Sequence, residues 1–375
     1  MIHFVTPVSA DWTVREYLSR WGLPVADRIR IEHYETLFQR ERIQSGSYVL
    51  SALCMLSPEE RTVLENLCER LAGAQSFRFL NHPTRSLRRL GLIEELARLG
   101  WNEFRAVRAT GDFEALRYPV FLRAERTHDG ALSPLLRSRR EVEAAIGRAL
   151  LRGRRLDDLL VVEFCDTSDE RGYYRKYSAY VVGDRILPRS VECGRAWMMK
   201  HSQSDFTRAI LEEERAYVVE NPHRDQLARI FSVARVDYGR IDYAVKDGRV
   251  QTWEINLLPT IGRGPGESKA LVPPELLPYR EETKAIFYRG FQEAWAAVDL
   301  PMDGWAPGPV SEAGASGPTP AAGAPKPSIL TRTLHRVPAR LRRAARRVLA
   351  PIAAPLVGRR ALRRARAEVD PGRVP

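Results

Sequence analysis

The stretch RIDYAVKDGRVQTWEINLLP, residues 240–259, is the part of this chain from which its expected fold follows. Two strand-like runs flank Asp247-Gly248, a dipeptide typical of a two-residue β-hairpin turn. Because strand side chains alternate between faces, Glu254 and Asn256 point the same way, and the hairpin brings Asp242 level with them. Two carboxylates and an amide on one face are hard oxygen ligands, suited to magnesium held beside a polyphosphate.

Two interpretations of these acids are open on spacing alone. They are ordinary surface charges in the first, because Asp237 and Asp247 show that acids are common nearby. They form a metal site in the second, because Glu254 lies between Trp253 and Ile255 in a run expected to be buried. A buried carboxylate needs a partner or a metal.

The first eighty residues alternate strand-like and helix-like segments, which predicts a small parallel α/β domain. The clearest start signal is Ser57-Pro58-Glu59-Glu60, where a Ser cap precedes Pro in the first turn of a helix expected to end near residue 71. The other expected elements are strands over residues 2–5, 28–32 and 48–56 and a helix over residues 13–20.

The region up to residue 300 mixes both element types and contains a second hairpin signal at Gly183-Asp184, between strand-like runs at residues 177–182 and 185–187. Strands are also expected over residues 118–123 and 159–165. The expected helices cover residues 86–99, 138–150, 205–218, 224–234 and 274–298.

The ordered elements Arg240-x-Asp242, a hairpin, Glu254-x-Asn256 and a following Pro resemble the C-terminal metal motif of the ATP-grasp superfamily, whose members are mostly ATP-dependent carboxylate–amine ligases. Upstream, residues 118–123 resemble the strand that contacts the phosphates in that family, and residues 160–166 resemble its adenine hinge. The resemblance covers about residues 80–300.

This resemblance implies the fold class, an α/β domain joined to α+β lobes. A small N-terminal parallel α/β domain at residues 1–80 would precede an ATP-grasp fold, with a nucleotide lobe at 81–180 and a metal-binding lobe at 181–300. It also implies an enzyme that activates a carboxylate as an acyl phosphate on Mg-ATP for attack by an amine, with a small-molecule or peptide substrate.

Site residues follow from the resemblance position by position. Asp242, Glu254 and Asn256 would hold Mg²⁺, with Glu254 bridging two ions. Arg240 would face the transferring phosphoryl group, and Lys200 is either a second catalytic cation or an ordinary solvated lysine. The implied nucleotide contacts are Arg123, Glu163, Phe164, Cys165, Asp166 and Lys176.

Two features depart from the family pattern. Arg123 stands where the phosphate strand usually ends in Lys, and the loop at residues 126–130, which includes His128, has the single glycine Gly130. A catalytically weak ATP-binding scaffold or regulator, and a phosphotransferase, therefore remain alternatives to a ligase. An Arg123 that points into a cleft beside Lys176 and Arg240 favours the ligase.

The composition of this 375-residue chain, 44% hydrophobic and 28% charged, is that of a globular protein and bears on its expected cellular location. It has no signal-peptide pattern and no apolar run long enough to span a membrane, so a cytoplasmic location is expected. The four cysteines lack metal-site spacing and are expected to be buried free thiols.

The basic charge of the chain belongs to its C-terminus. Residues 330–375 contain 13 arginines and only two acids, so they carry +11 of the net +12. A flexible linker at 301–328 and a disordered basic tail at 329–375 are expected from composition. The tail is a solvated extension, a contact to an anionic membrane surface or, least favoured, a nucleic-acid contact. The oligomeric state is not readable from the sequence.

Overall fold

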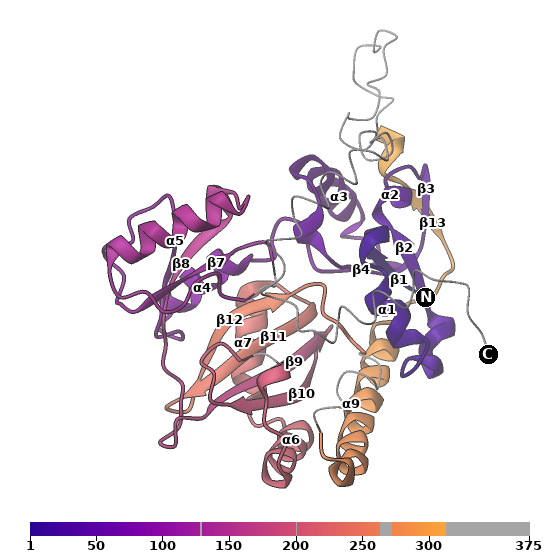
Figure 1. The fold of residues 1–375 in the computed structure, drawn as a ribbon. Coiled ribbons are helices and arrows are strands. Elements are labelled where there is room, and N and C mark those ends of the chain that lie inside the picture. Colours follow the sequence, from indigo (N-terminus) through magenta and orange to yellow (C-terminus); the bar gives the residue numbers. More distant parts are fainter. Residues whose placement is uncertain (128–129, 200, 263–271, 313–375) are drawn as a thin grey trace, which may run out of the picture. The chain divides into compact units, whose positions relative to one another are not determined.

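The computed structural model describes residues 1–127, 130–199, 201–262 and 272–312, which belong to one compact unit, Met1–Ala315 (Figure 1). His128, Lys200, the loop at residues 263–266 and the basic tail lie outside the described residues. The predicted fold class is confirmed, because a parallel sheet with helices precedes two lobes built on antiparallel sheets.

The N-terminal domain is built on a parallel sheet in the order β2-β1-β4-β5. Its expected helix after Ser57 is α3, and Ser57 and Glu60 form a reciprocal capping box there, which satisfies two backbone donors at the helix start. The elements of this domain are β1 (Ile2–Thr6), α1 (Trp12–Leu18), β2 (Ile29–His33), α2 (Tyr34–Leu37), β3 (Arg42–Gln44), β4 (Gly46–Leu50), α3 (Pro58–Leu71) and β5 (Phe77–Leu80).

The second region is a small antiparallel sheet in the order β6-β8-β7 with two helices. Helix α5 packs its buried Val142, Ala145 and Ala149 into one core with β7 and β8. The elements are α4 (Arg89–Arg98), β6 (Ala106–Arg108), β7 (Val120–Ala124), α5 (Arg139–Leu151) and β8 (Leu159–Glu163).

The third region is an antiparallel sheet in the order β10-β9-β11-β12. Strand β9 pairs with β10 and β11, so the expected boundary at residue 180 falls inside a strand of this sheet. The elements are β9 (Tyr174–Val182), β10 (Arg185–Gly194), α6 (Arg208–Glu220), α7 (Arg224–Ala234), β11 (Tyr238–Lys246) and β12 (Arg249–Asn256).

The long helix α9 (Leu277–Val298) joins the third region to the N-terminal domain (Figure 1). Phe291 contacts the ring of Tyr180 on β9, and Trp295 contacts Phe4 on β1. The hydroxyl of Ser47 on β4 donates to the carbonyl of Val298. These contacts give the two regions one continuous apolar core.

The predicted linker from residue 301 is wrong in its first part. Strand β13 (Trp305–Pro307) pairs antiparallel with β3, and Arg42 lies over the Trp305 ring at 5.7 Å. Arg70 of α3 also donates to the carbonyls of Pro307 and Gly308. Backbone pairing and these side-chain contacts fix residues 305–308 against the N-terminal domain, although the composition of this segment alone predicts a flexible chain.

Most other expected elements are present with small shifts, but the strand expected over residues 48–56 ends at Leu50, and Leu53–Met55 forms a 3-10 turn. The helices after residues 205, 224 and 274 are present as α6, α7 and α9, and short 3-10 turns complete the chain. Cys54 is exposed, whereas the sequence predicts a buried thiol. No helix in the described ranges combines the length and apolarity needed to cross a membrane. The 3-10 turns are Val8–Ala10, Leu23–Arg28, Leu53–Met55, Leu156–Asp158, His201–Gln203, Pro274–Leu276 and Pro309–Glu312.

Candidate active site

A cavity of about 870 Å³ opens on one face of the β10-β9-β11-β12 sheet. Its floor consists of alternate residues of neighbouring strands, as the period of two requires. Among the described residues, seven Arg or Lys side chains and three carboxylates line it, so this part of the cavity suits an anionic ligand. The cations are Arg123, Arg175, Lys176, Arg189, Arg240, Arg280 and Lys284, and the carboxylates belong to Glu192, Asp242 and Glu254.

The hairpin at the start of the sequence argument forms as predicted. Asp247 and Gly248 have φ values of +50° and +74°, which suits a tight two-residue turn. A register shift between Asp242 and Tyr243 then brings Asp242 opposite Glu254 and Arg240 opposite Asn256. Asp242 and Glu254, which are 12 positions apart in sequence, are thus neighbours on one face of the sheet.

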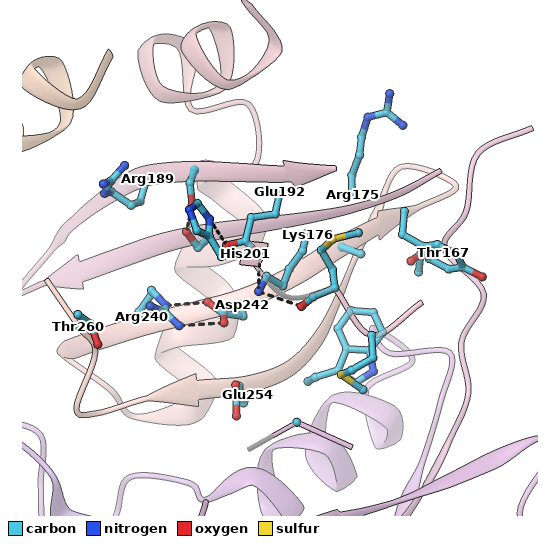
Figure 2. Close-up of a pocket in the computed structure, with 18 of the residues that line it drawn as sticks. Thr167, Arg175, Lys176, Arg189, Glu192, His201, Arg240, Asp242, Glu254 and Thr260 are labelled. Carbon is cyan, nitrogen blue, oxygen red and sulfur yellow. Dashed lines mark hydrogen bonds and ion pairs between the residues drawn. The ribbon is translucent and has the colours of Figure 1, made fainter. Parts of the chain in front are cut away.

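Arg240 and Asp242 form a two-pronged ion pair on β11. Nε of Arg240 lies 2.8 Å from Oδ1 of Asp242, and Nη2 lies 3.0 Å from Oδ2 (Figure 2). Burial lowers the pKa of Arg240, but the carboxylate of Asp242 more than offsets this and raises it overall. Arg240 is therefore a fixed cation with a set orientation on the cavity floor.

Glu254 is held by two arginines that come from the small second sheet region. Nη2 of Arg123, on β7, lies 2.7 Å from Oε2 of Glu254, and Arg89, on α4, donates to the same oxygen. Burial lowers the pKa of Arg123, and the charge of Glu254 opposes this. Arg123 thus lines the cavity together with Lys176 and Arg240, next to the β11-β12 hairpin.

Arg89 also fastens the chain that follows β7. Its guanidinium donates to the carbonyls of Ala124, Glu125 and Thr127, at 2.9 Å for Glu125 and 3.1 Å for Thr127. The loop that leads to Gly130 is therefore tied to Glu254 through one side chain. Arg89 was not predicted as a site residue, because no local sequence motif distinguishes it from the other arginines of its helix.

Lys176 lies on β9 on the same face, in a second charge cluster. Its Nζ is 2.7 Å from Oε2 of Glu192, and Nδ1 of His201 is 3.3 Å from Oε1 of the same residue (Figure 2). Burial raises the pKa of Glu192, but His201 and Lys176 outweigh it and lower the pKa to about 2. Glu192 and His201 were missed in the sequence, because β10 carries no recognisable motif.

The other end of the cavity is apolar and aromatic. The ring of Trp197 lies 5.1 Å from Phe121 and 5.8 Å from Phe164, and Met198 and Met199 complete the wall. A slot lined by flat rings and thioethers suits a planar heterocycle. The cavity therefore combines an apolar slot with a cationic floor.

Only some of the expected hinge residues line the cavity. Phe164 and Cys165 line the cavity, but Glu163 does not. The carboxylate of Glu163 is buried and bonded to Arg105 and to the backbone N–H of Arg117, so it stabilises the lobe. Asp166 accepts from the backbone and hydroxyl of Ser168 in a local turn, and the neighbouring Thr167 lines the cavity in its place.

Asp242 and Glu254 line the cavity and supply carboxylate oxygens of the kind that Mg²⁺ takes, whereas Asn256 is buried and is not among the lining residues. Oδ1 of Asn256 accepts from the backbone N–H of Leu258 at 2.8 Å, and both acids already contact arginines. A carboxylate oxygen has two lone pairs, so each acid can serve a cation and an arginine together.

Comparison with known proteins gives similarity at the level of the fold. No protein-family model matches the sequence, and a search of curated proteins found no match. The structure is similar to D-alanine–D-alanine ligase from Bacillus anthracis complexed with ATP, with 13% identity and a TM-score of 0.45 over 79% of this chain and 95% of that chain.

Two further solved structures show the same degree of similarity. An ATP-grasp RimK domain protein from Sphaerobacter thermophilus has 11% identity and a TM-score of 0.41, over 78% of this chain and 99% of that chain. D-cycloserine synthetase DcsG has 14% identity and a TM-score of 0.41 over the same shares. The chemistry of the cavity is therefore argued from its own residues.

Proposed function

We propose that this chain is an ATP-dependent ligase that activates a substrate carboxylate as an acyl phosphate and transfers the acyl group to an amine. The observation that carries the proposal is the cavity floor on which Asp242 lies opposite Glu254, with Arg123, Lys176 and Arg240 around them. The apolar slot beside this floor supports a nucleotide as the anionic ligand.

Each part of the cavity then has a task. The apolar wall formed by Phe121, Phe164 and Trp197 contacts the adenine, and the backbone of Cys165 lies at its edge. Arg123 and Lys176 contact the phosphates. Asp242, Glu254 and Asn256 would hold Mg²⁺, which when bound neutralises phosphate oxygens.

The residues act by positioning and by charge. A substrate carboxylate oxygen attacks the γ-phosphorus, which forms an O–P bond and releases ADP. Arg240, locked by Asp242, stabilises the negative charge on the transferring phosphoryl group. The amine then attacks the acyl carbon, an amide C–N bond forms, and phosphate and a proton leave. We assign Lys200, which is outside the described residues, to the phosphate-contacting cations.

A nucleotide-binding regulator is the second candidate. The observation that favours it is the double arginine contact to Glu254, which a bound magnesium ion would have to share. A phosphotransferase would use the same floor and stop after the first step.

Phosphate release and ADP formation from Mg-ATP, screened over carboxylates and amines, separate these functions. A ligase forms ADP and free phosphate only when a carboxylate and an amine are both present. ADP formed with a carboxylate alone would instead indicate a phosphotransferase. Nucleotide binding without ADP formation across the whole screen would indicate a regulator.

A further inference from the structure

One end of the cavity, formed by β10 and α9, carries cations that the proposed nucleotide site does not use. Arg189 on β10 and Arg280 and Lys284 on α9 all line it, together with Thr260 and Tyr288. The three cations interact with one another: burial is the largest cause of the lowered pKa of Lys284, and the charges of Arg280 and Arg189 lower it further.

Arg189 reaches this position through a β-bulge. The register of β10 against β9 passes from Pro188 opposite Ala179 to Ser190 opposite Ser178, which leaves Arg189 as the extra residue. A bulge redirects a side chain from the regular alternation of the strand. The guanidinium lies 5.0 Å and 5.5 Å from the ring centroids of Phe287 and Tyr288 on α9, so its direction is set by stacking.

Arg280 is the least compensated of the three. It is only 5% exposed, and within the described part of the chain its Nε and Nη1 have no hydrogen-bond partner. The nearest carboxylate oxygen is Oε1 of Glu214, 3.8 Å from Nε, and the guanidinium lies over the Phe206 ring at 4.6 Å. A buried guanidinium with unused donors is costly unless a ligand supplies acceptors.

The local charge balance also favours an anion. Lys284 is 9% exposed and pairs with Glu281 at 2.8 Å, while Glu214 pairs loosely with Arg280. Glu192, which also faces Arg280, is already paired with Lys176 and His201. Apart from Glu192, the three clustered cations therefore face two carboxylates of the described residues, and Arg280 keeps unused donors.

We propose that Arg189, Arg280 and Lys284 form an oxyanion subsite for the acceptor substrate, which takes a carboxylate or phosphate group additional to the carboxylate that reacts. A planar guanidinium with several free donors matches both groups. Tyr180 lies between this subsite and the phosphoryl site, because it interacts with Arg189 and with Arg240. The reaction at this subsite rests on the proposed function, but anion binding itself does not.

The test is isothermal titration of the full chain, at constant ionic strength, with glutarate, methylphosphonate and the uncharged glutaramide. We expect an anion to bind and glutaramide not to bind, and the tighter anion identifies carboxylate or phosphate as the preferred group. Arg189→Gln and Lys284→Gln should each weaken that binding about tenfold, the value of one charge-assisted hydrogen bond. Arg289→Gln is the matched control, because Arg289 is exposed on the same helix and does not line the cavity.

The charge-retaining variant Arg189→Lys should recover part of the affinity, and thermal unfolding without ligand checks that each variant is folded. The proposal is overturned if neither anion binds the wild type, or if Arg189→Gln and Lys284→Gln bind as tightly as the wild type. Mg-ATP is added to the same proteins as a separate arm. Anion binding that depends on Arg189 in a protein that Mg-ATP does not stabilise would refute the proposed function and leave the subsite standing.

Discussion

The two faces of the β10-β9-β11-β12 sheet differ in the kind of side chain they present, although these side chains come from neighbouring residues of the same strands. On the covered face, Tyr243 donates to the hydroxyl of Tyr217 at 3.0 Å and lies 2.9 Å from Nδ1 of His223. On the cavity face, the residue before it is Asp242, bound to Arg240. Around Tyr243 the covered face holds neutral polar groups that satisfy each other, whereas Asp242 and Arg240 on the cavity face are charged.

This difference teaches how one sheet can be both stable and reactive. Alternation along a strand places every second side chain in the aromatic layer under α6 and α7, so this layer is built from other residues than the cavity charges. Among the described residues, the cavity has more cations than carboxylates, and these cations keep donors for a ligand. Conservative substitutions on the covered face should therefore lower stability without removing nucleotide binding.

The largest effect is expected on the covered face. Tyr243→Ala should lower the free energy of unfolding by about 3–5 kcal/mol, because it removes a fully buried ring. Tyr243→Phe should cost only about 1 kcal/mol, the value of its hydroxyl bonds. Urea unfolding measures both. If the folded Tyr243→Phe protein is no longer stabilised by Mg-ATP, the claim that the covered face does not take part in nucleotide binding is wrong.

The next effect concerns the arginine that links the cavity face to the second sheet region. Arg89→Met should cost about 3 kcal/mol, because it removes a buried partner of Glu254 and leaves three carbonyls without their donor. Arg98→Met, exposed on the same helix, is the control and should change little. Equal urea midpoints for the two variants would mean that Arg89 does not hold this cluster together.

The smallest of these effects depends on pH. The pKa of Glu192 is about 2 in the folded protein, below that of an unfolded glutamate, so its contribution is present above about pH 4 and is lost as the pH falls towards 2. Glu192→Gln should therefore be less stable by roughly 2 kcal/mol at neutral pH, and this deficit should shrink below pH 4. Urea titrations at stepped pH measure the difference, and a deficit that stays constant over this range would contradict the assignment. Glu212→Gln, in an exposed pair with Arg208, is the control.

Local signals account for what the sequence could predict. Asp247-Gly248 specifies a tight turn, but an uninterrupted hairpin from that turn would place Asp242 opposite Trp253. The register shift between Asp242 and Tyr243, which no local signal predicts, brings Asp242 opposite Glu254. Ser57 and Pro58 likewise specify the start of α3. The order of such helices and strands along the sequence was sufficient to predict the fold class.

Long-range contacts account for what was missed. Arg89 and Glu254 are 165 residues apart, so no window of sequence shows that they meet. The bulge that turns Arg189 towards α9 depends on its register against β9, which composition does not encode. The pairing of β13 with β3 also overrides a local composition typical of linkers.

The central claim is that the cavity face of the sheet binds Mg-ATP through the hairpin acids, and thermal unfolding with and without Mg-ATP tests it most directly. Asp242→Asn removes one proposed ligand, and Asp247→Asn makes the same chemical change at the exposed turn of the same hairpin. The account predicts that Mg-ATP stabilises the wild type and Asp247→Asn, by about 2.7 kcal/mol at a concentration 100 times the Kd, and that Asp242→Asn loses this stabilisation. A wild type that Mg-ATP does not stabilise, or an Asp242→Asn variant that it stabilises equally, would contradict the account.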